Sequence, residues 1–111
     1  MATIGLPPTG PTGSALSHLE GALSGSKYDA ERLSGLDPAD AKPLLARYDL
    51  VRAGSTLTRV SLANRGAGGL WRWRELLPVR SWEFVVHMGE GSTPLEPARR
   101  LGARLGGAPA A

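Results

Sequence analysis

The clearest alternation of hydrophobic and polar positions lies between residues 81 and 88. A period of two residues places alternate side chains on opposite faces of an extended backbone, so this segment carries the strongest strand signal in the sequence. One face has Trp82, Phe84, Val86 and Met88, and the other has Ser81, Glu83, Val85 and His87. The Gly-Glu-Gly sequence at 89–91 breaks the pattern, and we predict that the strand ends there.

Two further strands are predicted in the first half of the chain. One contains Ala15, Leu16 and Leu19 and ends at Gly21, and the other alternates from Pro43 to Leu50. The stretch between them is rich in glycine and serine and contains an Asp-Pro turn signal. The pattern therefore indicates a small β unit over about residues 15–50.

Helical spacing dominates the middle of the chain. Thr56 is a candidate N-cap for a short helix over residues 57–64. Leu70, Trp73 and Leu77 share one face of a second helix. Proline disfavours helical backbone at the residue before it, so the proline at 78 should end this helix.

The ends of the chain differ from each other in their patterns. Leu101 and Leu105 lie four residues apart and are followed by two glycines, which predicts one or two helical turns with a glycine cap. Residues 1–13 are predicted to be a disordered leader, and residues 108–111 an unstructured tail. Together the elements predict a small α+β fold.

Composition narrows the class of protein. The 15 glycines and 9 prolines make up about a fifth of the 111 residues, against about 12% in average proteins, so irregular backbone should be abundant. Cysteine is absent, which excludes disulfides, thiolate metal sites and cysteine nucleophiles. The net charge of +3 comes without a run of five like charges, unlike a nucleic-acid-binding tail. Neither a signal peptide nor a membrane-length apolar run is found, so a soluble cytoplasmic protein is expected.

The segment from Gly89 to Leu95, Gly-Glu-Gly-Ser-Thr-Pro-Leu, is the most informative for chemistry. Its glycines allow backbone conformations closed to other residues, and its proline favours extended backbone at Thr93. Such a turn can present the hydroxyls of Ser92 and Thr93 to a small polar ligand, or it can be an ordinary turn after a strand. A phosphate loop is excluded, because no Gly-Lys-Ser/Thr sequence follows.

Other chemistry-bearing residues favour structural roles. Trp71 and Trp73 alternate with arginines, but on a helix they lie about 200° apart and form no common stacking surface for nucleic acid. The expected arrangement buries Trp73 in the core and leaves the arginines in water. His18 and His87 lie far apart in sequence, and neither has the spacing of a catalytic or metal-binding histidine.

Charged residues give no strong site signal either. Asp37, Asp40 and Asp49 match no calcium loop, and the Asp37-Pro38 pair is a natural turn start. Arg99 and Arg100 could hold a phosphate, but a solvated helix face explains them as well.

Read together, four ordered segments resemble the N-terminal end of threonine synthases, which belong to the fold-type-II pyridoxal-phosphate enzymes. They are Tyr28-Asp29-Ala30 with Arg32-Leu33, Lys42 to Leu50, Leu70 to Pro78, and Gly89 to Leu95 followed by Arg100-Leu101-Gly102. The resemblance covers about residues 15–106. The last motif is shared loosely with other enzymes of the group, and its combination with Trp-Arg-Trp-Arg-Glu-Leu-Leu-Pro is more specific.

The resemblance implies an activity and a domain plan. Threonine synthases convert O-phosphohomoserine and water to threonine and phosphate with pyridoxal phosphate. By analogy, residues 14–50 are expected to form a degenerate zinc-ribbon-like β unit, and residues 51–107 the N-terminal segment of an incomplete cofactor-binding domain. The candidate substrate-binding residues, at the edge of the active site, are Gly89, Glu90, Gly91, Ser92 and Thr93.

The sequence departs from the family at its expected metal site. Many relatives have two cysteine pairs around the Tyr-Asp segment, and in this alignment the pairs fall at Gly21 and Ser24 and at Asp37 and Asp40. A structural zinc ion needs four sulfur or nitrogen ligands, so no zinc is expected.

A second departure concerns catalysis. The family's Schiff-base lysine lies in an Asn-Pro-Thr-x-Ser-x-Lys-Asp segment beyond the Thr-Pro-Leu motif, whereas the only lysines here are Lys27 and Lys42, which do not match it. The glycine-rich loop for the cofactor phosphate is also absent. We therefore expect a truncated fragment with no catalytic residue and no productive cofactor binding on its own.

The alternative to a fragment is a free-standing, non-catalytic binding or regulatory remnant of the same region. No nucleic-acid or membrane partner is expected. In a complete enzyme, further elements would cover part of the apolar surface of this region. Exposure of that surface here is expected to promote self-association.

Overall fold

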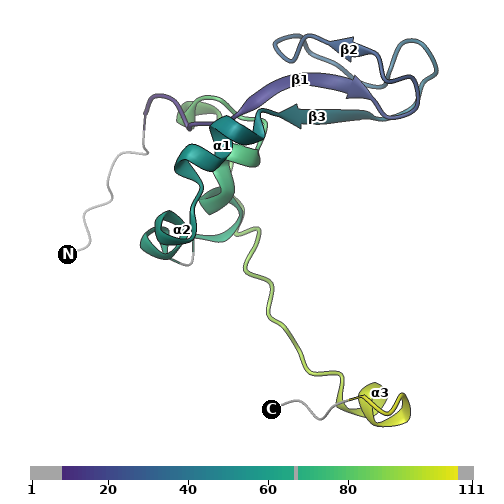
Figure 1. Cartoon of the computed structure of the whole chain (residues 1–111), viewed down its shortest axis with the longest axis vertical. Coiled ribbons are helices and arrows are strands. Elements are labelled where there is room, and N and C mark those ends of the chain that lie inside the picture. Colours follow the sequence, from purple (N-terminus) through teal and green to yellow (C-terminus); the bar gives the residue numbers. More distant parts are fainter. Residues whose placement is uncertain (1–8, 67, 108–111) are drawn as a thin grey trace.

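The computed structural model describes residues 9–66 and 68–107. Strand β1 (Leu16–Gly21) lies between β2 (Lys27–Tyr28) and β3 (Leu44–Tyr48) in a three-stranded antiparallel sheet. Short helices follow the sheet along the chain (Figure 1). The protein is therefore a small α+β fold, as the sequence pattern predicted.

The sheet confirms the two strands predicted in the first half. Leu19 pairs with Ala46 and Gly21 with Leu44, with an irregularity in the register between Leu16 and His18. Burial alternates along β3, where Leu45 is exposed and its neighbours Leu44 and Ala46 are partly covered. A period of two places one face of the strand against the protein, so the alternation that predicted a strand here is confirmed in β3.

Two helices, α1 (Leu50–Thr56) and α2 (Arg59–Arg65), follow β3. The carboxylate of Asp49 caps α1 by accepting the backbone N–H of Arg52 at 3.0 Å. Thr58 caps α2 in a reciprocal arrangement with Ser61. The prediction that Thr56 is the cap was wrong, because it ends α1 instead. The strand alternation through Leu50 and the glycine at position 54 hid this extra helix in the sequence.

The predicted helix around Trp73 is a 3₁₀ helix, η1 (Gly69–Leu76), and it ends before the proline as expected. Trp73 has non-helical backbone angles (φ −102°, ψ 28°), which kink the element. The kink changes which side chains face inward: Trp73 is 42% exposed and Glu75 only 2%. The expectation of a core Trp73 was therefore wrong.

The strongest strand prediction, at residues 81–88, was also wrong. Trp82–Phe84 form one 3₁₀ turn, η2, and only Ser81 makes a bridge, with Pro11. A strand needs a neighbour that takes its backbone hydrogen bonds, and periodicity alone does not supply one. Val86 and Met88 are 71% and 84% exposed as a result.

Part of the expected leader is ordered. The Thr12 N–H donates to the carbonyl of Arg80 at 3.0 Å, and its hydroxyl donates to the carbonyl of Val79 at 2.6 Å. The Ser14 hydroxyl donates to the carbonyl of Leu77 at 2.5 Å. Residues 9–13 thus belong to the folded body, while residues 1–8 and the predicted tail at 108–111 lie outside the described residues.

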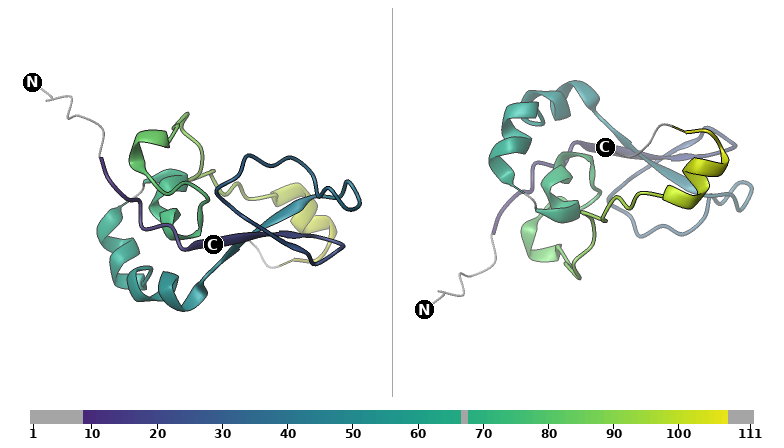
Figure 2. Two further views of the ribbon diagram at one scale, coloured as in Figure 1. Left: turned by 90° about the horizontal axis from the view of Figure 1, so that it is seen from above. Right: turned by 90° about the horizontal axis from the view of Figure 1, so that it is seen from below.

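The core lies where the sheet meets the helices. Among the described residues its buried apolar members are Ala15, Leu16 and Ala53. Beyond the turn at residues 89–91, which still contacts η1, the chain leaves this body and reaches helix α3 (Arg99–Arg104), which ends near Gly106 as predicted (Figures 1 and 2). The radius of gyration is 18.9 Å, against about 13 Å for a compact chain of this length.

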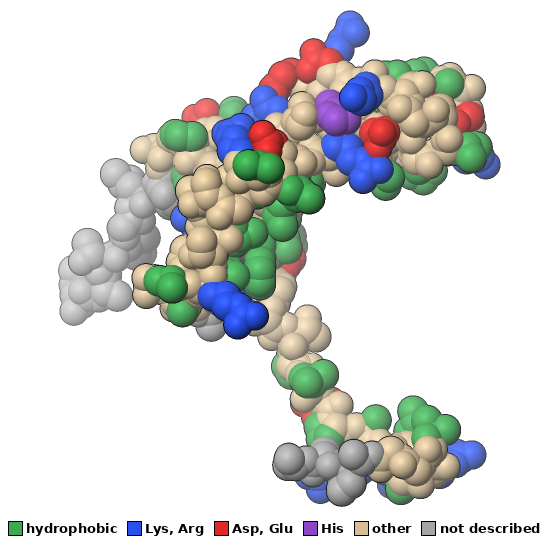
Figure 3. All heavy atoms as spheres, in the orientation of Figure 1, with side chains coloured by type: hydrophobic (Ala, Val, Ile, Leu, Met, Phe, Trp, Pro, Cys, Tyr) green, Lys and Arg blue, Asp and Glu red, His purple; other side chains and the backbone are tan. Residues whose placement is uncertain are grey.

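Many large apolar side chains remain in solvent. Leu95 is 99% exposed, and hydrophobic side chains emerge beside α1 and α2 in the space-filling view (Figure 3). In residues 9–66 and 68–107, none of the helices has the length and hydropathy needed to cross a bilayer.

Candidate functional site

The five candidate substrate-binding residues form an exposed turn. Gly89, Gly91 and Ser92 have positive φ values of 86°, 88° and 51°. Only glycine adopts this conformation without strain, so the two glycines are required by the backbone, and Ser92 is held in a less favourable conformation. The hydroxyls of Ser92 and Thr93 make no hydrogen bond within the described part of the chain.

This turn docks against the start of η1 through its backbone. The Leu70 N–H donates to the carbonyl of Glu90 at 3.0 Å. A Cβ added to Gly91 would overlap the backbone of Gly69 and Leu70, so the close approach also needs glycine.

Glu90 stabilises the turn rather than facing a ligand. Its carboxylate accepts the Met88 N–H at 2.8 Å and lies 3.2 Å from Nδ1 of His87. The backbone hydrogen bond from Met88, with a smaller contribution from His87, lowers the pKa of Glu90 below its usual value.

A second cluster surrounds Asp37, which is buried. Its carboxylate accepts the hydroxyl of Ser24 and the hydroxyl of Tyr28, both at 2.5 Å, and the backbone N–H of Ala39 at 2.9 Å. A Cβ on Gly21 would overlap Asp37 Oδ2 and Ser24 Oγ. Three of the four positions that the resemblance assigns to cysteines, Gly21, Ser24 and Asp37, therefore lie together.

The hydrogen bonds shift two pKa values in this cluster. The bond from Ser24, followed by that from Tyr28, lowers the pKa of Asp37, since both favour the ionised carboxylate. The same bond to Asp37, with burial, raises the pKa of Tyr28. Asp37 is thus a hydrogen-bonding centre that joins the turn after β1, strand β2 and the 37–42 turn.

A hollow of about 550 Å³ opens between the N-terminal segment, the helices and η2. Three arginines and one carboxylate line it. The carboxylate of Glu75 accepts hydrogen bonds from Nη1 of Arg65 at 2.9 Å and from Nη2 at 2.5 Å. It also accepts a hydrogen bond from the Thr56 hydroxyl at 3.1 Å. The other lining residues are Pro11, Thr12, Gly13, Arg52, Arg74 and Trp82.

The Arg65–Glu75 pair is well shielded from solvent, because the side chains are only 13% and 2% exposed. The hydrogen bonds from Arg65 outweigh the cost of burial and lower the pKa of Glu75 to about 2. Sequence spacing did not single out this hollow, since its residues come from five separate segments.

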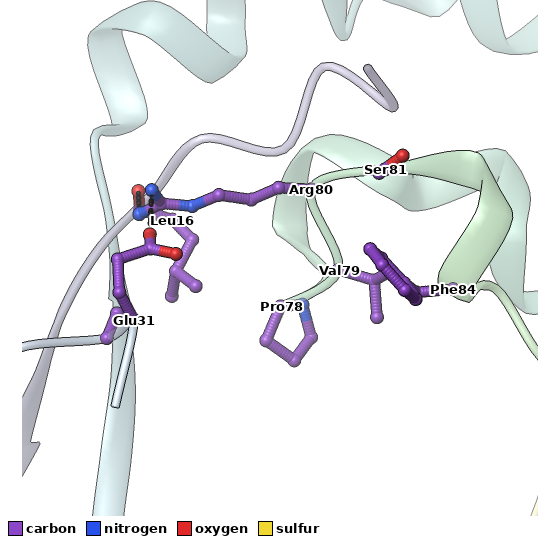
Figure 4. Close-up of a pocket in the computed structure, with 8 residues that line it drawn as sticks. Leu16, Glu31, Pro78, Val79, Arg80, Ser81 and Phe84 are labelled. Atoms are coloured by element: carbon purple, nitrogen blue, oxygen red, sulfur yellow. Dashed lines mark hydrogen bonds and ion pairs between the residues drawn. The ribbon is translucent and has the colours of Figure 1, made fainter. Parts of the chain in front are cut away.

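A smaller groove of about 270 Å³ lies between the sheet and the 78–84 segment (Figure 4). Leu16, Pro78, Val79 and Phe84 supply its apolar walls. At its rim Arg80 pairs with Glu31 and also donates to the carbonyl of Leu16 at 2.9 Å.

The remaining sequence candidates lie apart. Asp49 is a helix cap, and Asp40 accepts the Lys42 N–H at 2.9 Å within a turn. The hydroxyl of Ser17 lies 2.9 Å from Nδ1 of His18, far along the chain from His87. Arg99 and Arg100 lie on the separate helix α3.

The arginines next to the tryptophans are not simply solvated, which corrects that expectation. Arg72 lies over the ring of Trp73 (5.6 Å to the centroid) and donates to the carbonyl of Leu62 at 2.9 Å. In the described residues, Trp71 Nε1 and Arg72 Nε are buried without a hydrogen-bond partner.

Comparison with protein-family models finds no match, and comparison with curated proteins and with solved structures finds none either.

Proposed function

We propose that this chain forms the N-terminal portion of a threonine-synthase-like protein and acts there as a non-catalytic scaffold. The support comes first from the four ordered segments quoted above. Within that protein the turn from Gly89 to Thr93 lies at the edge of the substrate site, where the free hydroxyls of Ser92 and Thr93 contact the substrate.

The observation that carries the proposal is the cluster at Asp37. The resemblance assigns a structural metal to Gly21, Ser24, Asp37 and Asp40, so it requires these positions to meet in space. Contacts join the first three of them, and the last lies in the same turn as Asp37. A hydrogen-bonded carboxylate then takes the place of a metal ion as the centre of the β unit.

The exposed segment from Val86 to Ala98 also supports a scaffold role. Its side chains Val86, Met88 and Leu95 are at least 71% exposed. Apolar groups of this size gain about 1.5–3 kcal/mol each when buried. We infer that they pack on the polypeptide that carries the catalytic lysine.

The residues present do not fit pyridoxal phosphate. Lys27 on β2 and Lys42 before β3 both belong to the sheet region, while the candidate turn docks on η1. No step of imine chemistry is therefore assigned to this chain.

The first test is to read the DNA downstream of the codon for Ala111. A sequence encoding Asn-Pro-Thr-x-Ser-x-Lys in any frame is the expected result. An unrelated gene after a clean stop would instead favour the free-standing remnant.

The second test is to co-express this chain with the downstream polypeptide and measure co-purification. Leu95→Asp should reduce co-purification strongly, because it places a charge in the proposed contact. Leu33→Asp is the matched control, since Leu33 is equally exposed but lies in the loop after β2. Equal effects of the two substitutions would contradict the proposed contact.

A further inference from the structure

We propose that the hollow between Arg52, Arg74 and Trp82 binds a small, doubly charged oxyanion, and that a phosphate group is its best match. The inference stands on this hollow alone and is independent of the proposed scaffold function. It names a binding site in the folded body, away from the turn at 89–93.

The charge balance of the lining supports an anion. Glu75 is the only carboxylate among the lining residues, and it is fully engaged by the guanidinium of Arg65. This pair is neutral and forms one wall. The guanidiniums of Arg52 and Arg74 remain, and neither makes an ion pair within the described residues. The free positive charge of the hollow is therefore two.

Arg74 is held in place without its charge being neutralised. Its guanidinium lies over the ring of Trp82, 5.7 Å from the centroid. A cation–π contact positions the group while leaving its N–H donors at the edge available. Arg52 comes from the first turn of α1, whose backbone is fixed by the Asp49 cap. The two cations thus approach the hollow from separate elements.

The hydroxyls of the hollow do not select the ligand. Thr12 donates its hydrogen to the carbonyl of Val79, and Thr56 donates to Glu75. The available donors are therefore guanidinium N–H groups. A planar guanidinium can donate two parallel hydrogen bonds to two oxygens of a phosphate or sulfate, and the double negative charge of such an anion balances the two positive charges of the hollow. The volume of about 550 Å³ leaves room for an organic group attached to the phosphate.

The test is calorimetric titration of the full chain with inorganic phosphate at low and moderate salt. Arg74→Gln and Arg52→Gln should each weaken binding about tenfold, because each removes a charged hydrogen-bond donor. Arg52→Gln is the safer variant for folding, since Arg52 is exposed. Arg100→Gln is the matched control, as it removes the same charge from α3, outside the hollow.

The variants distinguish specific binding in the hollow from non-specific attraction of phosphate to a positively charged protein. Binding that Arg100→Gln leaves intact, and that either hollow variant weakens, supports the proposal. Equal losses in all three variants indicate non-specific attraction and overturn it, as does the absence of binding at low salt. Arg74→Lys adds a further check. It keeps the positive charge but loses the paired N–H donors of the guanidinium, so its affinity for phosphate should lie between those of Arg74→Gln and the wild type.

Discussion

The buried pair of Arg65 and Glu75 gives the sharpest prediction about stability. Glu75 is 2% exposed and accepts two guanidinium hydrogen bonds. Its pKa falls from 4.5 to about 2 in the folded protein. One pKa unit corresponds to about 1.4 kcal/mol, so the ionised carboxylate contributes about 3 kcal/mol of folding free energy at neutral pH.

The direction of the pH dependence follows from the lowered pKa. The contribution of Glu75 is complete well above pH 4.5, where the carboxylate is ionised in both the folded and the unfolded chain. It decreases as the pH falls, because the unfolded chain takes up the proton first. At about pH 2 most of the contribution is lost.

Glu75→Gln tests this directly. The substitution removes the charge and leaves the guanidinium of Arg65 without its partner, so we expect a loss of about 3 kcal/mol at pH 7. The difference between the wild type and the variant should shrink steadily below pH 4.5. Urea unfolding followed by tryptophan fluorescence measures both, because Trp71 and Trp73 lie in the same 3₁₀ helix as Glu75.

Glu96→Gln is the control, since Glu96 is exposed in the segment that leaves the body. It should change stability by less than about 0.5 kcal/mol at any pH. If Glu75→Gln does not fold at pH 7, NMR titration of the Glu75 carboxyl in the wild type tests the same point. A stability difference that stays constant from pH 7 to 3, or a Glu75 pKa near 4.5, would contradict the predicted role of the Arg65–Glu75 pair.

Three further predictions concern the turn, the β unit and a helix cap. Gly91→Ala should destabilise the protein more than Gly89→Ala: both positions have positive φ, but only Gly91 would place its Cβ against Leu70. In urea unfolding, the free energy of unfolding should fall by about 1 kcal/mol for Gly89→Ala and by more for Gly91→Ala. Asp37→Asn should lower the melting temperature at pH 7 and move the pKa of Tyr28 down toward 10, as read by ultraviolet titration of tyrosine; an unchanged Tyr28 pKa would contradict the hydrogen bond. Thr58→Ala should cost about 1 kcal/mol in the same urea assay, and no change would show that the cap of α2 is not important.

Local sequence signals predicted those elements that carry a clear local pattern, an alternation of apolar and polar residues or a proline. The strands β1 and β3 and the end of η1 before proline fall where alternation and proline placed them. The cap of α2 was predicted at Thr56 instead of Thr58, and α1 with its cap at Asp49 was not predicted, because all three residues are acceptable caps and only the fold selects among them.

The candidate turn was predictable in shape but not in surroundings. Glycine at 89 and 91 indicated unusual backbone, and both residues have positive φ. That Gly91 would contact the backbone of Gly69 and Leu70 could not be read from spacing, because the contact joins segments about twenty residues apart through backbone atoms alone.

Residue type and local periodicity were enough to predict the class of fold, the positions of the turns and the absence of cysteine chemistry. Three features became clear only from the folded structure: residues 82–88 form no strand, Glu75 rather than Trp73 is buried, and Arg52, Arg65 and Arg74 line one hollow. The cause is the same in all three. Burial of a side chain, pairing of a strand and the meeting of several charges in one hollow all depend on which distant segments come together. A local sequence pattern carries no information about such contacts.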